Sequence, residues 1–490
     1  MTVASNARAD VVDWSRRLDR LRRQRLVVPG SAVPDPAPRD RAAGAMSLAR
    51  ASRLADALGG TLEDGPGGAV VHVHASAELS APAELSASAE LSAPLERLGS
   101  LPWPIDTSRP LVCLDTETTG LGTAAGTVAF LVGLGRWDGR RFAIEQLLLP
   151  DHPDEPAFLA ALETVIPEGA WLVTYNGRGF DWPLLSTRYR LHCGPPPALA
   201  GHLDLLPIAR QLWRHRLDDA RLPTVEAGVL GIRRGDDLPG ALIPARYFEY
   251  LRTGRPEPLR AVLRHNAQDV VSLGLLLAHL ATRLADPDAR HREHPGDVAA
   301  LGRAYARRRR FHEALACCDA ALETAGRLSP GERVYGGWLR ERDGARDSPR
   351  GSAGGLPYAA AERDGIAAER ARILRLAGHR ETARGAWLEL ATRGGRLAAY
   401  AWVQVAKHDE HVRRDPPAAL AAAERAARLA ERDQYLGRPA LGVERDLARR
   451  LVRLRGKATR AHAHSAAPEA KQPLARPVGS ESPPGQAGIA

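Results

Sequence analysis

The sequence predicts a mixed α/β domain over residues 105–285, followed by an all-α domain over residues 290–455. Three observations lead to this prediction. Short apolar runs of the buried-strand type alternate with helical segments in the first of these regions. The dipeptide Asp138-Gly139 between two apolar segments is a strong signal for a β-hairpin. After residue 290 the strand signals vanish, and small and large residues recur at the spacing of paired helices.

The elements of the α/β domain follow one another in a clear order. A short buried strand at 111–114 runs into Asp115, and the hairpin strands follow at 129–137 and 141–149. A helix at 155–165 then leads into a second buried strand at 171–175. Further helices are expected at 182–191, 206–216, 222–230 and 258–285. Strand, hairpin, helix, strand and helices in this order describe a mixed sheet covered by helices.

The helical region carries a repeating pattern of small and large residues. Leu301-Gly302-x-x-Tyr305, followed by Ala314 and Ala321, is similar to the tetratricopeptide pattern, in which two antiparallel helices interlock. A weaker second unit spans 371–387, and a third spans 400–429 with extra residues between its helices. A Gly/Arg/Ser-rich stretch at 326–356 is expected to be a loop insertion between the first two units.

The two ends of the chain are expected to be poorly ordered. Residues 1–104 are rich in Pro, Ala and Gly and include the hexapeptides AELSAP, AELSAS and AELSAP over 77–94. A period of six with proline interruptions indicates a linker, since solenoid units need about 20 residues or more. Residues 456–490 are of low complexity and are expected to form a disordered tail.

Composition excludes several classes of protein. No stretch approaches the roughly 20 consecutive apolar residues that a membrane span needs. The N-terminal residues lack the apolar core of a signal peptide, and the four cysteines form no CxxC pair. These observations argue against a membrane protein, a secreted disulfide-rich domain and a zinc ribbon, and they predict a cytoplasmic protein.

The charge of the chain is unevenly distributed. The formal net charge is +10, but residues 105–285 carry −1 and the residues after 285 carry +11. Almost all basic residues are Arg, which suits phosphate contacts and also follows from GC-rich codon usage. The regional excess fits a polyanionic partner.

Four carboxylates form the central functional signal. Asp115 and Glu117 end a buried strand, and residues i and i+2 of a strand share a face. Adjacent like charges are costly unless a cation neutralises them. Asp181 follows the next buried strand, and Asp269 lies on an apolar stretch of the long helix, where a buried charge needs a partner.

The motifs around these acids resemble a known family. LDTETTGL at 114–121, YNGRGFD at 175–181 and HNAQD at 265–269 are similar to the three exonuclease motifs of the DEDD 3′–5′ exonucleases. The order, the spacing and the strand–strand–helix placement match over roughly 180 residues. A bacterial branch of this superfamily joins such a domain to tetratricopeptide repeats. The resemblance implies a ribonuclease-H-like fold with a mixed sheet of about five strands.

The resemblance also implies a set of site residues. Asp115, Glu117, Asp181 and Asp269 would hold two Mg²⁺ or Mn²⁺ ions, a choice that their hard oxygen ligands favour. Two such ions about 3.5–4 Å apart can activate a water and stabilise the leaving 3′ oxygen. Four further residues match positions that contact or shape the pocket of the terminal nucleotide: Thr118, Leu121, Asn176 and Phe180. For Leu121 and Phe180, ordinary core packing is the alternative.

One histidine departs from the family pattern. In the histidine type of these exonucleases the His lies five residues before the last Asp, and in the tyrosine type a Tyr lies four before. Here His265 lies four residues before Asp269, one helical turn away on the same face. We expect it to orient or deprotonate the attacking water. The alternative is that it binds the substrate phosphate.

The function expected from these residues is a metal-dependent 3′–5′ exonuclease that acts on RNA or DNA, with a single-stranded 3′ end as its nucleic-acid partner. The repeats would grip nucleic acid or recruit a protein partner. Two alternatives are an inactive binding scaffold and an endonuclease on the same fold. All four acids are present, which favours the enzyme. Nothing in the residues separates RNA from DNA, because that choice depends on contacts to the 2′-hydroxyl.

Overall fold

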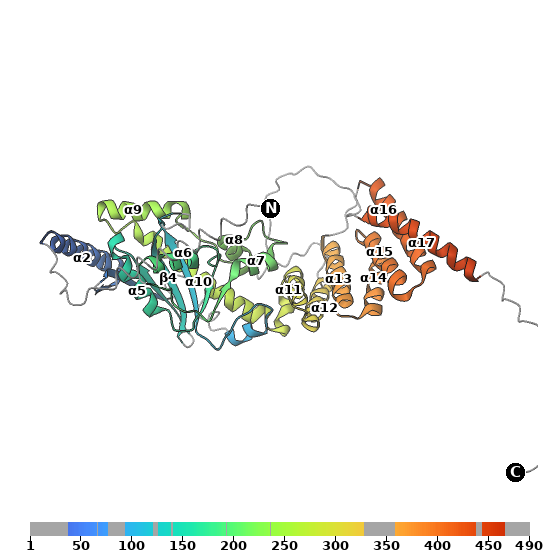
Figure 1. Cartoon of the computed structure of the whole chain (residues 1–490), viewed down its shortest axis with the longest axis horizontal. Coiled ribbons are helices and arrows are strands. Elements are labelled where there is room, and N and C mark those ends of the chain that lie inside the picture. The colour runs from blue at the N-terminus through green and yellow to red at the C-terminus, as the bar shows by residue number, and fades with distance from the viewer. Residues whose placement is uncertain are drawn as a thin grey trace, which may run out of the picture.

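The structure is a computed structural model that describes residues 38–65, 67–76, 94–120, 126–138, 141–192, 194–235, 237–327, 358–437 and 443–465 (Figure 1). Five parts of the sequence predictions lie outside these residues: residues 1–37, the hexapeptide segment 77–93, Leu121, residues 328–356 of the expected loop insertion, and the tail from residue 466.

Within the described residues, one mixed sheet of seven strands organises the α/β domain, in the order β1-β2-β5-β4-β3-β6-β7. Its strands are β1 (Thr61–Gly65), β2 (Gly68–Ser76), β3 (Leu111–Thr118), β4 (Ala129–Asp138), β5 (Arg141–Leu148), β6 (Trp171–Thr174) and β7 (Gly201–Asp204). β4 and β5 form the hairpin expected around Asp138-Gly139. β6 runs parallel to both β3 and β7, and the other pairings are antiparallel.

The expectation of about five strands is therefore wrong. The two additional strands, β1 and β2, come from residues 61–76, within the N-terminal region expected to be poorly ordered. β2 pairs with β5 and buries Val70, Val71 and Val73 against the sheet core. The apolar run of β2 is typical of a strand, but it lies in a Pro- and Ala-rich region. Its partner, β5, is distant in the sequence, so the pairing is not visible from the sequence alone.

The sheet separates two hydrophobic cores, and successive side chains of β3 point into one core and the other in turn. Val112 and Leu114 lie in one core, with residues of α2 (Pro38–Leu58), α5 (Glu155–Val165), α6 (Asp181–His192) and α9 (Ile243–Thr253). Leu111 and Cys113 lie in the other core, with residues of α7 (Leu205–Trp213) and α8 (Leu222–Val225). The long helix α10 (Leu259–His279) contributes its first turns to one core and its later turns to the other.

A row of helices extends from the α/β domain (Figure 1). They are α11 (Pro295–Arg307), α12 (Phe311–Arg327), α13 (Tyr358–Leu376), α14 (Arg380–Arg393), α15 (Ala398–His408), α16 (Pro416–Tyr435) and α17 (Val443–Ser465). Each helix contacts the next along the chain. At Gly302 a Cβ would lie 3.0 Å from the backbone oxygen of Ala314 and 3.2 Å from Cβ of Cys317, so the small residue permits close packing of α11 on α12.

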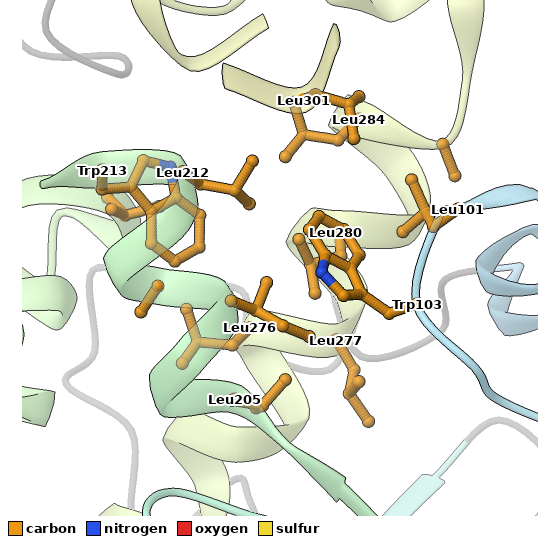
Figure 2. Close-up of a cluster of buried hydrophobic side chains, with 14 of the residues drawn as sticks. Leu101, Trp103, Leu205, Leu212, Trp213, Leu276, Leu277, Leu280, Leu284 and Leu301 are labelled. Atoms are coloured by element: carbon orange, nitrogen blue, oxygen red, sulfur yellow. The ribbon is translucent and has the colours of Figure 1, made fainter. Parts of the chain in front are cut away.

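The α/β domain and the first helices share one core. Figure 2 shows Leu301 of α11 in the same buried cluster as Leu212 and Trp213 of α7 and Leu276 and Leu277 of α10. The same cluster continues through α12 to Ile373 of α13. Apolar burial is therefore continuous across residue 285. α17 also extends to Ser465, ten residues beyond the expected end of the helical domain.

Among the described residues, no helix combines the length and the apolar character needed to cross a membrane.

Candidate functional site

The candidate site begins at the carboxyl end of β3. Asp115 and Glu117 continue the face of this strand that carries Leu111 and Cys113, because alternate residues of a strand share a face. Burial raises the pKa of both carboxyl groups well above their ordinary values, and neighbouring acids raise it further. The two carboxylates therefore lie close together, as the sequence predicts, in a place that favours a compensating cation.

Asp181 reaches the same place from the first residue of α6. Its Oδ1 accepts a hydrogen bond from the buried hydroxyl of Thr116, the residue of β3 between the two strand-end acids. Burial raises the pKa of Asp181 to about 6, although the Thr116 hydrogen bond opposes this rise. The charge of Asp181 also contributes to the raised pKa of Asp115. The first two motifs are thus joined at the strand ends.

The turn that delivers Asp181 is held by another acid. Asn176 adopts a φ of 70°, a left-handed conformation in which Asn is enriched. Oδ1 of Asp204 accepts from the Asn176 N–H at 2.8 Å, and Oδ2 accepts from the Arg178 N–H at 3.3 Å. Asp204 also caps α7 by accepting from the Leu206 N–H at 3.0 Å. These contacts make Asp204 an anchor of the turn.

The fourth acid, Asp269, comes from α10, which packs closely on β4. A Cβ at Gly133 would lie 2.1 Å from Oδ1 of Asn266, so glycine permits this approach. Nδ2 of Asn266 donates to Oδ2 of Asp115 at 2.9 Å, while its Oδ1 accepts from Gln146 at 2.8 Å. The charge of Asp269 raises the pKa of Asp115. The third motif therefore meets the first.

Arg234 neutralises part of this negative charge. It donates to Oδ1 of Asp269, to both carboxylate oxygens of Glu226 at 2.7 Å each, and to Asp237 at 2.9 Å. The Glu226 side chain is fully buried. Burial raises the pKa of Asp269, and the adjacent Arg234 guanidinium opposes that rise.

His265 lies between two acids. Its Nδ1 is 2.8 Å from Oδ1 of Asp237, and its Nε2 is 3.9 Å from Oδ2 of Asp269. Burial acts to raise the pKa of Asp237, but hydrogen bonds from Arg234 and His265 bring it below its ordinary value. Asp237 is therefore a carboxylate that accepts from Nδ1–H, and this leaves Nε2 to face Asp269.

The residues expected to contact the terminal nucleotide differ in their surroundings. Thr118 is buried, and its hydroxyl donates to the backbone oxygen of Gly120 at 2.6 Å. Asn176 is exposed, and Phe180 is half-buried immediately before Asp181. Leu121 lies outside the described residues. Substrate contacts for these positions stay predictions.

Several residues of the site were missed by sequence reasoning: Asn266, Gln146, Arg234, Glu226 and Asp237. Asn266 offered a signal, since it is a polar residue within HNAQD on an otherwise apolar helix. The others are distant in sequence from the three motifs, and only the fold brings them to the acids.

Comparison with known proteins bears on the central part of the chain. Residues 112–281 match the family described as "RNase_H superfamily". These residues form a ribonuclease H superfamily domain. The superfamily includes nucleases, and such nucleases typically use divalent metals. The "Uncharacterized protein YprB" of Bacillus subtilis (strain 168) is 42% identical over 186 residues. That match covers 38% of this chain and 45% of the relative.

The donor set of the site fits hard divalent cations. Its four acids supply carboxylate oxygens, the ligands that Mg²⁺ and Mn²⁺ prefer. Burial raises the pKa of all four, and neighbouring acids raise those of Asp115 and Glu117 further. A divalent cation would compensate their negative charges.

Proposed function

We propose that this protein is a metal-dependent 3′–5′ exonuclease that hydrolyses phosphodiester bonds of RNA or DNA. One observation carries the proposal: acids from three separated motifs interact electrostatically at the carboxyl end of β3. These acids are Asp115, Glu117, Asp181 and Asp269. The match of residues 112–281 to the ribonuclease H superfamily supports a nuclease.

Asp115, Glu117, Asp181 and Asp269 would hold two Mg²⁺ or Mn²⁺ ions. Asp115 would contribute to both positions, Glu117 and Asp269 to the water side, and Asp181 to the leaving-group side. When bound, two such ions activate a water and stabilise the departing 3′ oxygen in an in-line displacement.

The protein's own groups would position these ligands and the reacting proton. Asn266 orients Asp115 through the hydrogen bond between Nδ2 and Oδ2, and Gln146 fixes the amide orientation of Asn266. Asp237 holds His265 through Nδ1, so that Nε2 would accept a proton from the attacking water. Glu117 would accept a hydrogen bond from the terminal 3′-hydroxyl. Four further residues would lie around the terminal nucleotide: Thr118, Leu121, Asn176 and Phe180.

We assign the helical region a role in gripping the polynucleotide upstream of the 3′ end. The region consists of successive helices, which we interpret as tetratricopeptide-like pairs, and arrays of such pairs offer extended surfaces. The residues after 285 carry a net charge of +11, against −1 for residues 105–285.

The decisive experiment is a Mg²⁺-dependent digestion of 3′-labelled, 5′-labelled and circular RNA and DNA. A 3′–5′ exonuclease releases label first from the 3′ end and leaves circles intact. Asp115→Asn and Asp269→Asn should each abolish cleavage, as should EDTA with the wild type. Asp218→Asn removes an exposed acid of the same domain and should retain activity.

The digestion series also separates the alternatives. Cleavage of circles would indicate an endonuclease. Binding of nucleic acid without any metal-dependent cleavage would indicate an inactive scaffold. Full cleavage in EDTA would contradict the two-metal mechanism.

A further inference from the structure

A second group of ligand-type side chains lies far in sequence from the four acids, where the α/β domain meets the helical region. His215 follows α7, His294 caps the start of α11, and Glu362 lies on α13. One donor atom from each of these side chains lies within 4.8 Å of a donor atom of the other two.

His294 and Glu362 bring two possible metal-ligand atoms close together. Nδ1 of His294 accepts a hydrogen bond from the backbone N–H of Gly296 at 3.1 Å, and a backbone nitrogen can only donate. Nδ1 is therefore unprotonated, yet it lies 3.6 Å from Oε1 of Glu362. A proton or a metal cation between these two atoms would relieve their repulsion, and a metal ion would take the Nδ1 lone pair in place of the Gly296 N–H. Two ligands of a tetrahedral Zn²⁺ are about 3.3 Å apart, since each bond is about 2.0–2.1 Å.

Gly296 provides the space in which the other two ligands converge. A Cβ at this position would lie 2.3 Å from Nε2 of His215 and 2.7 Å from Oε1 of Glu362. Gly296 is the second residue of α11, and glycine favours a helix less than alanine does. Alanine would suit the helix better at this position, but only glycine leaves room for His215 and Glu362.

A buried carboxylate lies beside the cluster. Oδ1 of Asp297 is 3.3 Å from Nε2 of His215, and the Asp297 side chain is 1% exposed. Arg216 binds both oxygens of Asp297 through its Nε, at 3.0 and 3.1 Å. Asp297 is thus held by Arg216 and adds negative charge next to the three side chains.

We propose that His215, His294 and Glu362 bind Zn²⁺, or a related first-row divalent ion that prefers nitrogen ligands. Two imidazoles and one carboxylate are a common zinc ligand set, with a fourth position open to water. Nitrogen ligands select against Mg²⁺, which distinguishes this site from the all-oxygen site at β3. The bound ion would link α7 of the α/β domain to α11 and α13 of the helical region.

The test measures metal binding by the full-length chain, without an affinity tag, in excess Mg²⁺ to occupy oxygen-only sites. Co²⁺ serves as the probe, because nitrogen ligation in a tetrahedral site gives visible absorption bands, and Zn²⁺ is then added to displace it. The wild type should bind one Co²⁺ with these bands, and Zn²⁺ should raise its melting temperature.

Two conservative variants should lose this binding while folding normally. His294→Asn keeps a side chain that caps helices well but withdraws the imidazole. Gly296→Ala fills the space between His215 and Glu362 and improves helix propensity. Each should weaken Zn²⁺ binding by at least about 10–100-fold, the loss already caused by removing a group that only orients a ligand. With a chelator present, their circular dichroism should match the wild type.

Two controls make the outcome unambiguous. His312→Ala removes an exposed histidine of α12 and should bind Zn²⁺ like the wild type. Asp115→Asn, in the β3 site, should also leave the Co²⁺ bands unchanged. The proposal is overturned if His294→Asn and Gly296→Ala bind Zn²⁺ as the wild type does, or if Asp115→Asn alone removes binding. Either result leaves the nuclease proposal to its own digestion test.

Discussion

Asp269 illustrates how a buried charge acquires partners from distant sequence. On α10 it lies between apolar residues, so its sequence alone predicts that some group must compensate it. The compensating group is Arg234, which comes from the loop after α8 and binds Glu226 and Asp237 as well. Removing one member of such a buried network leaves the others uncompensated.

His265 gives a prediction for catalysis at the level of one side chain. If Nε2 takes the proton of the attacking water, His265→Ala should lower the maximal rate by about 10²–10⁴, the usual contribution of a general base. Its substrate affinity should barely change. Single-turnover cleavage and separate binding measurements on the same 3′-labelled strand give the two quantities.

The same measurements distinguish the alternative role of His265. A variant that mainly loses affinity would place the imidazole on the substrate phosphate. Asp237→Asn is the matched variant, because it keeps a hydrogen-bond acceptor for Nδ1 but removes the negative charge beside the ring. It should lower the rate less than His265→Ala.

At the level of elements, the last helix is fixed by one glutamate. Glu410, in the turn after α15, accepts from Arg450 at 2.5 Å and from Arg453 and Lys457 at 2.9 Å each, all three on α17. The Glu410 side chain is 1% exposed. Hydrogen bonds from Arg453 above all lower the pKa of Glu410 to about 2. Ion pairs to Glu410 therefore hold α17 against the preceding helices, in addition to the apolar contacts of that helix.

This network predicts a pH-dependent stability. Because the pKa of Glu410 is about 2 in the folded state and ordinarily 4.5, its stabilisation is present above pH 4.5 and is lost as the pH falls toward 2. Glu410→Gln should cost about 3–5 kcal/mol at pH 6, as for a broken buried ion pair. The difference from the wild type should shrink at pH 3. Urea unfolding followed by circular dichroism measures both.

A nearby acid supplies the control for this prediction. Glu444 is exposed on α17, so Glu444→Gln should change stability by less than about 0.5 kcal/mol at either pH. A Glu410→Gln variant that is as stable as the wild type at pH 6 would contradict the assigned role.

At the scale of the whole molecule, the shared core decides how the two regions can be studied. Leu284, Leu301 and Trp213 lie in one buried cluster, so cutting the chain after residue 285 would expose apolar surface (Figure 2). A role of the helical region is therefore better tested by surface substitutions in the full chain than by truncation.

The exposed arginines at the end of α11 provide such a test. Arg307, Arg308 and Arg309 are exposed at the turn into α12. If they contact phosphates, replacing all three with Gln should weaken binding of long single strands. The slope of log affinity against log salt should fall by about 2, since each phosphate contact contributes about 0.7. Fluorescence anisotropy at several salt concentrations measures this.

The matched control removes the same charge from the α/β domain. Arg190, Arg252 and Arg255 are exposed there, and their replacement by Gln should leave the salt dependence nearly unchanged. Equal effects of the two triple variants would contradict a specific grip by the helical region. Unchanged binding in both would favour a protein partner for the helices.

The sequence by itself determined the parts of this protein that depend on local pattern. The short apolar run before Asp115 indicated its strand, Asp138-Gly139 indicated the hairpin, and the spacing of Gly302 and Ala314 indicated paired helices. These signals work because strand, turn and helix geometry are set by neighbouring residues. The ordered motifs likewise pointed to the four acids.

Only the tertiary structure decided what depends on contacts between distant segments. It added β1 and β2 to the sheet, joined the two regions through one core, and brought Arg234 to Asp269. It also placed His215 and Glu362 beside each other across the gap left by Gly296. No local pattern encodes these contacts, because a side chain's partner across the fold is fixed by packing, and packing is a property of the whole chain.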